Sequence, residues 1–219
     1  MHAHPYTIVD NFFSNPDVIR EYALSLNFSS SPEGRWPGER TQNLHEIDPR
    51  FFNQLMEKIS YIFADRTPKD FLEYSCGATF QKISADYNKG WVHADDPASL
   101  TCIIYLTPQG NINSGTSFFK LKNGVLPDWK YEEVKRKGTL DSSYRKSAEY
   151  NNALNYNNDQ FEETMRVGGN YNRFIAFDSP EYHAANDFNT NEERLTMVLF
   201  FDKLNYLTTP PIARMRYYL

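Results

Sequence analysis

The 219-residue sequence has no hydrophobic run long enough to cross a membrane, because its longest apolar stretch, near Met197 to Phe201, is far short of the roughly 20 residues that a transmembrane helix needs. Cysteine is scarce as well. A small secreted scaffold carries more than Cys76 and Cys102, which both stand in apolar, strand-like contexts, so we interpret them as reduced core residues. Residues 1–5 lack the basic and apolar regions of a signal peptide. These absences predict a cytoplasmic protein without membrane association.

The sequence has no excess of positive charge either. Its 23 Lys and Arg residues stand against 28 Asp and Glu, which gives a net charge of −5, and no Lys/Arg-rich run interrupts this balance. A surface that binds nucleic-acid phosphates is therefore not expected. With 40% hydrophobic and 16% aromatic residues, the chain can bury a sizeable core. We expect a single domain over residues 1–219, and the sequence does not indicate its oligomeric state.

Two helices and a series of short strands are expected. Pro16 suits a first helical position, apolar residues then follow at helical spacing as far as Leu26, and Asp48-Pro49 opens a second amphipathic helix. The polar segment between them, 29–43, is expected to be irregular. β-Branched and aromatic residues predict strands at 6–10, 74–84, 100–107, 116–121, 172–178 and 194–202. The pattern indicates a mainly β (α+β) fold in which N-terminal helices back a sheet.

A long polar segment, 122–169, interrupts these strands. It is rich in Asn, Tyr and Lys, and Glu132–Lys137 and Gln160–Arg166 are each expected to form a helical turn or two. A connection of this length is either an insertion, such as a functional lid, or a solvated excursion without a role.

Two of the five histidines stand in contexts that point to a metal site. His93 and Asp95 are two residues apart, so in an extended segment their side chains project to the same side, whereas Asp96 projects to the other. His183 follows 90 residues later, just after the apolar strand that ends at Asp178. Two His and one carboxylate on one face leave positions open on the metal, which suits Fe(II) and O2 chemistry.

An arginine at the start of an apolar strand adds to this pattern. Arg194 stands 11 residues after His183 and opens an otherwise apolar strand. A basic residue there is costly unless an anion pairs with it, and a guanidinium can hold a carboxylate through two parallel hydrogen bonds. Thr196 stands two residues on and can add a hydroxyl on the same face.

The ordered set His93, Asp95, His183 and Arg194 resembles the Fe(II)/2-oxoglutarate-dependent dioxygenases, in particular their prolyl-4-hydroxylase-like branch. Three local stretches are also similar to this family: Tyr87–His93 before the first ligand, Leu100–Thr107 as the next core strand, and the glycine-turn strand Ser114–Phe118. The resemblance covers roughly residues 6 to 205 and is weak between Lys122 and Gly169.

The resemblance implies a double-stranded β-helix, a jelly-roll or cupin-like barrel with the metal in its open mouth. It implies that His93, Asp95 and His183 hold Fe(II) as the catalytic centre and that Arg194 holds the distal carboxylate of 2-oxoglutarate. O2 is the further co-substrate, and succinate and CO2 are released as a C–H bond of a small molecule, amino acid or peptidyl residue is hydroxylated. Further candidates to contact 2-oxoglutarate are Thr196, Tyr87, Tyr105 and Gln81.

Other interpretations of the same residues stay open. His93 and Asp95 also fit a surface turn, since Asp-Asp-Pro is a good turn sequence, and Arg194 also fits a strand end paired with Glu192 or Glu193. A cupin-like module that binds a small carboxylate or a protein partner would explain Arg194 without iron. Two His and one carboxylate would also serve a zinc hydrolase. Arg40, in a Trp-Pro-Gly-Glu-Arg turn, is either a substrate contact or part of a surface ion pair.

Overall fold

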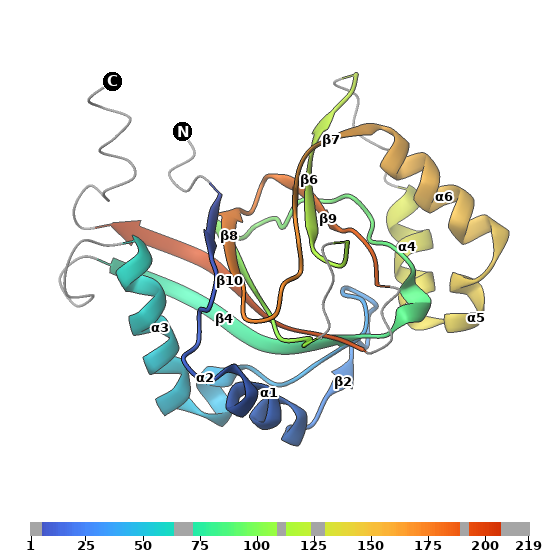
Figure 1. Ribbon diagram of the computed structural model, residues 1–219. Helices are drawn as coiled ribbons and strands as arrows, with labels where there is room; N and C mark the ends of the chain where they lie inside the picture. The colour runs from blue at the N-terminus through green and yellow to red at the C-terminus, as the bar shows by residue number, and fades with distance from the viewer. Residues whose placement is uncertain (1–5, 64–71, 109–112, 124–129, 189–192, 207–219) are drawn as a thin grey trace, which may run out of the picture.

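The fold consists of two antiparallel sheets that face each other, with one group of helices against the outer face of the larger sheet and another beside the smaller sheet (Figure 1). The computed structural model describes residues 6–63, 72–108, 113–123, 130–188 and 193–206. This is the mixed, mainly β architecture with backing N-terminal helices that the sequence predicts.

The larger sheet has seven strands, and every pair of neighbours in it is antiparallel. In spatial order they are β1 (Thr7–Val9), β8 (Phe174–Asp178), β5 (Leu100–Tyr105), β10 (Arg194–Tyr206), β4 (Leu72–Ile83), β3 (Glu39–Arg40) and β2 (Ser29–Ser30). The smaller sheet has three strands in the order β7 (Phe161–Val167), β6 (Thr116–Leu121) and β9 (Tyr182–Ala185). Most strands that are neighbours in space are not consecutive in sequence, as in a jelly roll.

Strand alternation divides the interior into two parts. In β10, Leu195, Met197 and Leu199 pack in the core under the helices, whereas Arg194 and Val198 face the other way, into the space between the sheets. The N-terminal helices that cover the first core are α1 (Pro16–Ser25), α2 (Leu44–Ile47) and α3 (Pro49–Phe63). One face of the large sheet is thus committed to the helices, and the other is free to build a site.

A second group of helices lies beside the smaller sheet (Figure 1). It comprises α4 (Lys130–Leu140), α5 (Ser142–Arg145) and α6 (Ala148–Asp159), all inside the long polar segment 122–169. None of the helices that the structure describes has the length and apolar character that a membrane span requires.

The structure confirms most of the expected elements and corrects others. The expected helical turn at Gln160–Arg166 is wrong: this segment is strand β7, which pairs with β6 from Phe161↔Leu121 to Val167↔Thr116. Pairing with a formed strand here outweighs the weak local preference of Glu, Met and Arg for helix. The expected irregular segment 29–43 contains the short strands β2 and β3, which extend the edge of the large sheet.

Cys76 and Cys102 are both free thiols, as expected. Cys102 is fully buried in β5, and Cys76 is partly buried in β4. Burial raises the pKa of the Cys76 thiol to about 12, which leaves it protonated and unreactive at neutral pH.

One surface ion pair fastens the N-terminal strand to the sheet. Arg173 donates through Nε to Asp10 Oδ1 at 2.6 Å and through Nη2 to Asp10 Oδ2 at 2.9 Å. Hydrogen bonding from Arg173 lowers the pKa of Asp10. Because the folded-state pKa is below the unfolded one, the pair stabilises the fold above about pH 4, and this stabilisation is lost as the pH falls through the lower value.

We therefore expect Asp10→Asn to reduce the free energy of unfolding at pH 7 by less than about 1 kcal/mol, since Asp10 is mostly exposed. The difference from wild type should shrink below about pH 4. Urea unfolding at pH 7 and at pH 3 measures both effects. The control is Glu162→Gln, which breaks the exposed pair with Lys120. A deficit in Asp10→Asn that stays constant with pH would contradict the assignment.

Candidate metal centre and its cavity

A pair of backbone hydrogen bonds joins the two histidines of the candidate site. The His93 N–H donates to His183 O at 3.0 Å, and the His183 N–H donates to His93 O at 2.8 Å. His183 lies on β9 of the smaller sheet, and His93 lies on the extended segment that leads toward β5. Two residues that exchange both backbone hydrogen bonds in this way lie directly opposite each other, with their side chains on the same face. The ring centroids of the two histidines are 4.5 Å apart.

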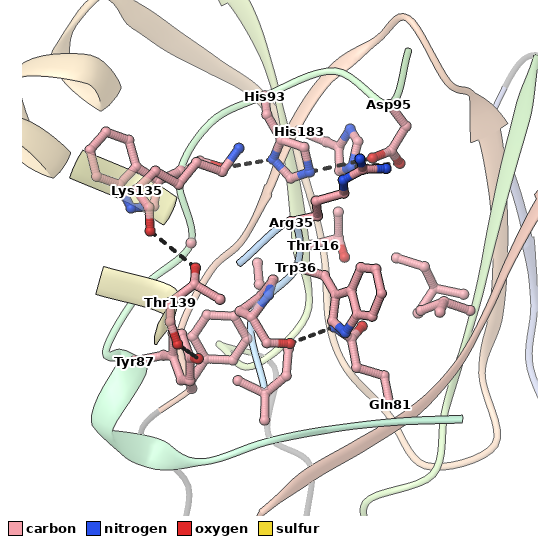
Figure 2. Close-up of a pocket in the computed structure, with 18 of the residues that line it drawn as sticks. Arg35, Trp36, Gln81, Tyr87, His93, Asp95, Thr116, Lys135, Thr139 and His183 are labelled. Carbon is pink, nitrogen blue, oxygen red and sulfur yellow. Dashed lines mark hydrogen bonds and ion pairs between the residues drawn. The ribbon is translucent and has the colours of Figure 1, made fainter. Parts of the chain in front are cut away.

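Asp95 completes a cluster of three side chains. Its Oδ1 lies 3.4 Å from His93 Nε2, and its Oδ2 lies 3.3 Å from His183 Nε2. One ligand atom from each residue lies within 4.8 Å of the others. Figure 2 shows the three side chains pointing toward one another. The adjacent Asp96 is exposed and lies outside the cluster, as the alternation predicts.

The far nitrogen of each imidazole is bound to the backbone. His93 Nδ1 lies 2.8 Å from Trp91 O, and His183 Nδ1 lies 2.9 Å from Glu181 O. A carbonyl oxygen only accepts, so each Nδ1 carries the proton and donates it. The lone pair of each Nε2 therefore points into the cluster, which is the arrangement that second-shell hydrogen bonds impose on metal-binding histidines.

Asp95 is held from the large sheet. Thr101 Oγ1 of β5 donates to Asp95 Oδ2 at 2.9 Å, and Ser179 Oγ lies 2.8 Å from Thr101 Oγ1. The Asp95 N–H donates to Ser179 O at 2.9 Å. These contacts fix the carboxylate in one orientation, and they come from β5 and from the residue that follows the neighbouring strand β8.

The protonation states suit a cation. Burial and the neighbouring His183 lower the pKa of His93. Burial alone would raise the pKa of Asp95, but interaction of its carboxylate with His183 and His93, when these imidazoles are protonated, outweighs burial and holds this pKa far below its usual value. At neutral pH the cluster therefore offers a neutral imidazole and a carboxylate, the forms in which these groups bind metals.

Arg194 lies on the wall of the same cavity and is 6% exposed. Its Cζ lies 5.4 Å from the ring centre of Tyr105 and 5.6 Å from that of Phe188, and its Nε lies 3.4 Å from Ser114 O. Burial lowers the pKa of Arg194, and Tyr105 opposes the shift. In the part of the chain that the structure describes, which excludes Glu192, no carboxylate forms an ion pair with it. A strand-end pair with the exposed Glu193 is not formed.

The other candidates for a 2-oxoglutarate contact lie in different places. Thr196 and Tyr105 are register partners on β10 and β5 and are fully buried near Arg194. The Thr196 hydroxyl has no hydrogen-bond partner among the described residues, and the Tyr105 hydroxyl lies 2.7 Å from Thr116 Oγ1. Gln81 lines the cavity but donates to Pro37 O at 2.8 Å.

Tyr87 also lines the cavity, and its hydroxyl already has hydrogen-bond partners. It accepts from the Gly38 N–H at 3.0 Å and lies 3.4 Å from Thr139 O of α4. Figure 2 shows Tyr87 beside Thr139, with Trp36 and Gln81 across from them. The structure thus brings His93, Asp95, His183 and Arg194 to one cavity and uses Tyr87 to join two parts of its rim.

The cavity has a volume of about 310 Å³. Its floor is formed by the cluster and by β5 and β10, and its rim by the loop around Trp36 and by α4 with Lys135 and Thr139. The loop and the helix meet closely at Gly34, where an added Cβ would lie 2.7 Å from Arg136 O. Gly34 also has φ +68°, which a glycine adopts without strain.

The sequence pattern did not identify several residues that support the site. Thr101 and Ser179 hold Asp95, and α6 supports the segment before His93, but no local motif marks them. Thr101 was accessible to sequence reasoning in one way, because it shares a strand face with Tyr105 at a period of two. The roles of Ser179 and α6 depend on contacts between distant segments.

The support from α6 consists of direct hydrogen bonds. The Val92 N–H donates to Asn158 Oδ1 at 2.9 Å, and Asn158 Nδ2 donates to Gly90 O at 2.9 Å. Trp91 Nε1 donates to the Tyr150 hydroxyl at 2.9 Å. The polar segment 122–169 is therefore tied to the backbone immediately before His93.

Comparison with solved structures places the fold in one class. HygX from Streptomyces hygroscopicus, with nickel, 2-oxoglutarate and hygromycin B bound, superposes with a TM-score of 0.55 at 10% identity, covering 91% of this chain and 83% of that chain. A prolyl hydroxylase from Trichoplax adhaerens, in complex with a hypoxia inducible factor peptide, gives 0.51 at 13% identity and covers 90% and 82%. EvdO2 from Micromonospora carbonacea var. aurantiaca gives 0.54 at 14% identity and covers 96% and 91%. The fold is the double-stranded β-helix of the 2-oxoglutarate-dependent oxygenases, as the sequence resemblance implied.

Residues 1–201 match the profile of a family of unknown function, DUF6445, and the chain belongs to that family. No curated protein matches the chain.

If α6 positions the segment that carries His93, Asn158→Ala should loosen it. We expect backbone amide hydrogen exchange of residues 90–95 to become about tenfold faster, since two hydrogen bonds to that backbone are lost. Asn151→Ala on the same helix is the control, because Asn151 Nδ2 donates to Ser147 O within the helical segment and not to the backbone before His93. Exchange-detected mass spectrometry measures both. Equal protection of 90–95 in the two variants would refute the positioning role.

Proposed function

We propose that the protein is an Fe(II)- and 2-oxoglutarate-dependent oxygenase that hydroxylates a C–H bond of a small molecule, with release of succinate and CO2. The observation that carries the proposal is the presence of two features in one cavity. One is a His93–Asp95–His183 cluster with both Nδ1 atoms bound to backbone carbonyls, and the other is the buried Arg194. A metal and an anionic co-substrate account for both.

The donor set fits such a metal. Two imidazole nitrogens and one carboxylate oxygen, from His93, His183 and Asp95, would hold Fe(II) on one face and leave further positions open. When bound, the iron and 2-oxoglutarate would supply the oxidising chemistry of the reaction. The protein orients the ligands through Trp91 O, Glu181 O and the hydroxyl of Thr101.

Arg194 would bind the distal carboxylate of 2-oxoglutarate. It is a cation whose burial calls for an anion, and the unpartnered hydroxyl of Thr196 and the ring of Tyr105 lie at its side. The surrounding apolar residues, among them Ile103, Val198 and Phe200, would exclude water from this end of the cavity. Exclusion of water strengthens each charged contact inside.

A zinc hydrolase would need a general base beside the metal. Among the described residues that line the cavity, the carboxylates are Asp95, which is in the cluster, and the exposed Asp96. This composition supports oxygenase chemistry over hydrolysis. The retained carboxylate at Asp95 supports hydroxylation over halogenation, which in related enzymes requires Gly or Ala there.

We extend the proposal to the organisation of the chain. Residues 1–219 form one oxygenase domain, and the helices of segment 122–169 act as a lid over the cavity. The free thiols of Cys76 and Cys102 support a cytoplasmic location. The acidic net charge supports a substrate other than nucleic acid.

The test is an anaerobic titration of the Fe(II)-loaded protein with 2-oxoglutarate, followed by the visible charge-transfer band. We expect a saturable band in wild type. Asp95→Ala should abolish the band because the metal loses a ligand, and Arg194→Gln should weaken 2-oxoglutarate binding roughly 10- to 100-fold, since a charged hydrogen-bonded pair is lost.

Asp96→Ala is the matched control, since it removes the neighbouring carboxylate that lies outside the cluster. It should leave the band unchanged. Absence of a band in folded, iron-bound wild type would refute the oxygenase and leave a binding module. If wild type shows the band, incubation with isotopically labelled 2-oxoglutarate under O2 tests for labelled succinate.

A further inference from the structure

A second arginine lines the same cavity. Arg40 lies on β3, where it pairs in register with Gln81 of β4. Its Cζ lies 4.9 Å from the ring centre of Trp36 and 5.3 Å from that of Phe200. Stacking against two aromatic rings orients the planar guanidinium and leaves its edge for hydrogen bonds.

The guanidinium of Arg40 has one unsatisfied nitrogen, although the residue as a whole is only partly buried. Its Nε is buried, with no hydrogen-bond partner among the residues that the structure describes. Burial lowers the pKa of Arg40 to about 10, and the charge of Asp95 opposes this shift, so the side chain is a cation at neutral pH. The expected alternative, a surface ion pair, is not formed in the described part of the chain.

Asp95 does not satisfy Arg40. The carboxylate oxygens of Asp95 face the two histidines and Thr101, and no ion pair joins Asp95 to Arg40. In the proposed function the Asp95 charge is committed to the metal. The Arg40 charge then faces the cavity without an anion, at a cost that a bound anion would remove.

The charged residues that line the cavity also favour the binding of an anion. The chain carries a net charge of −5, but the described residues that line the cavity include five Lys or Arg and two Asp. Two of these cations stand in ion pairs at the rim, Arg35 with Glu33 and Lys135 with Glu132. Arg194 is assigned to 2-oxoglutarate, which leaves Arg40 and Lys89. Of these two, Arg40 has a buried nitrogen without a hydrogen-bond partner among the described residues, and it is therefore the candidate for a second anion.

The size of the cavity restricts the molecule that carries this anion. Its volume of about 310 Å³ lies at the low end of the about 300–1,000 Å³ usual for ligand pockets. The loop that carries Trp36 is held by two hydrogen bonds. The Gly38 N–H donates to the Tyr87 hydroxyl, and Pro37 O accepts from the Gln81 side chain. A pocket of this size with a fastened rim fits a small molecule.

We propose that Arg40 binds the oxyacid group, carboxylate or phosphate, of a small anionic substrate whose C–H bond is presented to the metal cluster. The inference rests on the proposed function for the reaction. The anion site itself depends only on Arg40, Trp36 and Phe200. Arg40 and Arg194 would then hold two different anions in one cavity, and their separate partners would keep the substrate and 2-oxoglutarate from exchanging places.

The experiment observes the Trp36 indole N–H directly. The 15N-labelled protein, treated with Zn(II) and 2-oxoglutarate, is titrated with acetate, inorganic phosphate and neutral acetamide while the indole N–H resonances are followed by NMR. The resonance of Trp36 is assigned as the one that is missing from the spectrum of Trp36→Phe. We expect a saturable shift with acetate, phosphate or both and none with acetamide. The preferred anion distinguishes a carboxylate substrate from a phosphate substrate.

Arg40→Gln should weaken anion binding about tenfold or more, since a charged hydrogen-bonded pair is lost. Arg40→Lys should restore part of the affinity, because charge returns without the planar fork. Arg35→Gln is the matched control on the same loop and should bind anions as wild type does. Trp36 shifts that are equal in wild type and Arg40→Gln would overturn the proposal.

Two outcomes separate this inference from the oxygenase proposal. If wild type fails to bind 2-oxoglutarate but the Trp36 shift remains dependent on Arg40, the oxygenase is refuted and the anion site stands. If Arg40→Gln loses 2-oxoglutarate binding instead, Arg40 belongs to the co-substrate site and the inference is overturned. Thermal unfolding of each variant verifies that it is folded.

Discussion

The reciprocal hydrogen bonds between the backbones of His93 and His183 are the interaction on which the site depends. They join a segment of irregular structure to a strand of the smaller sheet, although the two residues are 90 positions apart in the sequence. The pair fixes the distance between the two rings, and the carbonyl bonds of each Nδ1 then fix their rotation. Asp95 can face both Nε2 atoms only because the bridge has already placed them on one side of its carboxylate.

Uncompensated positive charge is the second constraint, and it organises the rest of the cavity. A buried arginine without an anion is costly, so a protein retains it where a ligand supplies the anion. Arg194 and Arg40 both line the cavity, and each lies over aromatic rings and forms no ion pair with a carboxylate among the described residues. The acidic surface of the chain and the basic interior of its cavity would together favour a small anion over a polyanion such as nucleic acid.

The sequence predicted the parts of the structure that local patterns determine. Helix α3 and strand β10 follow from periodicity within one segment, and His93 and Asp95 follow from their spacing. Strand β7 was expected to be helical, because its Glu, Met and Arg residues become a strand only when β6 pairs with them. Helix α6 and its contacts with Gly90 and Val92 were out of reach for the same reason: they join segments more than 60 residues apart.

The residues proposed to bind the metal with 2-oxoglutarate and the residues proposed to bind the substrate anion come from different parts of the fold. The His93–Asp95–His183 cluster and Arg194 belong to β9, β10 and the segment before β5, whereas Trp36 comes from the N-terminal loop, Arg40 from the short strand β3 that follows it, and Lys135 from α4. Tyr87 links two of these outer segments, the loop and α4, through its single hydroxyl. Substitutions in the outer segments can therefore change which anion enters without disturbing the cluster.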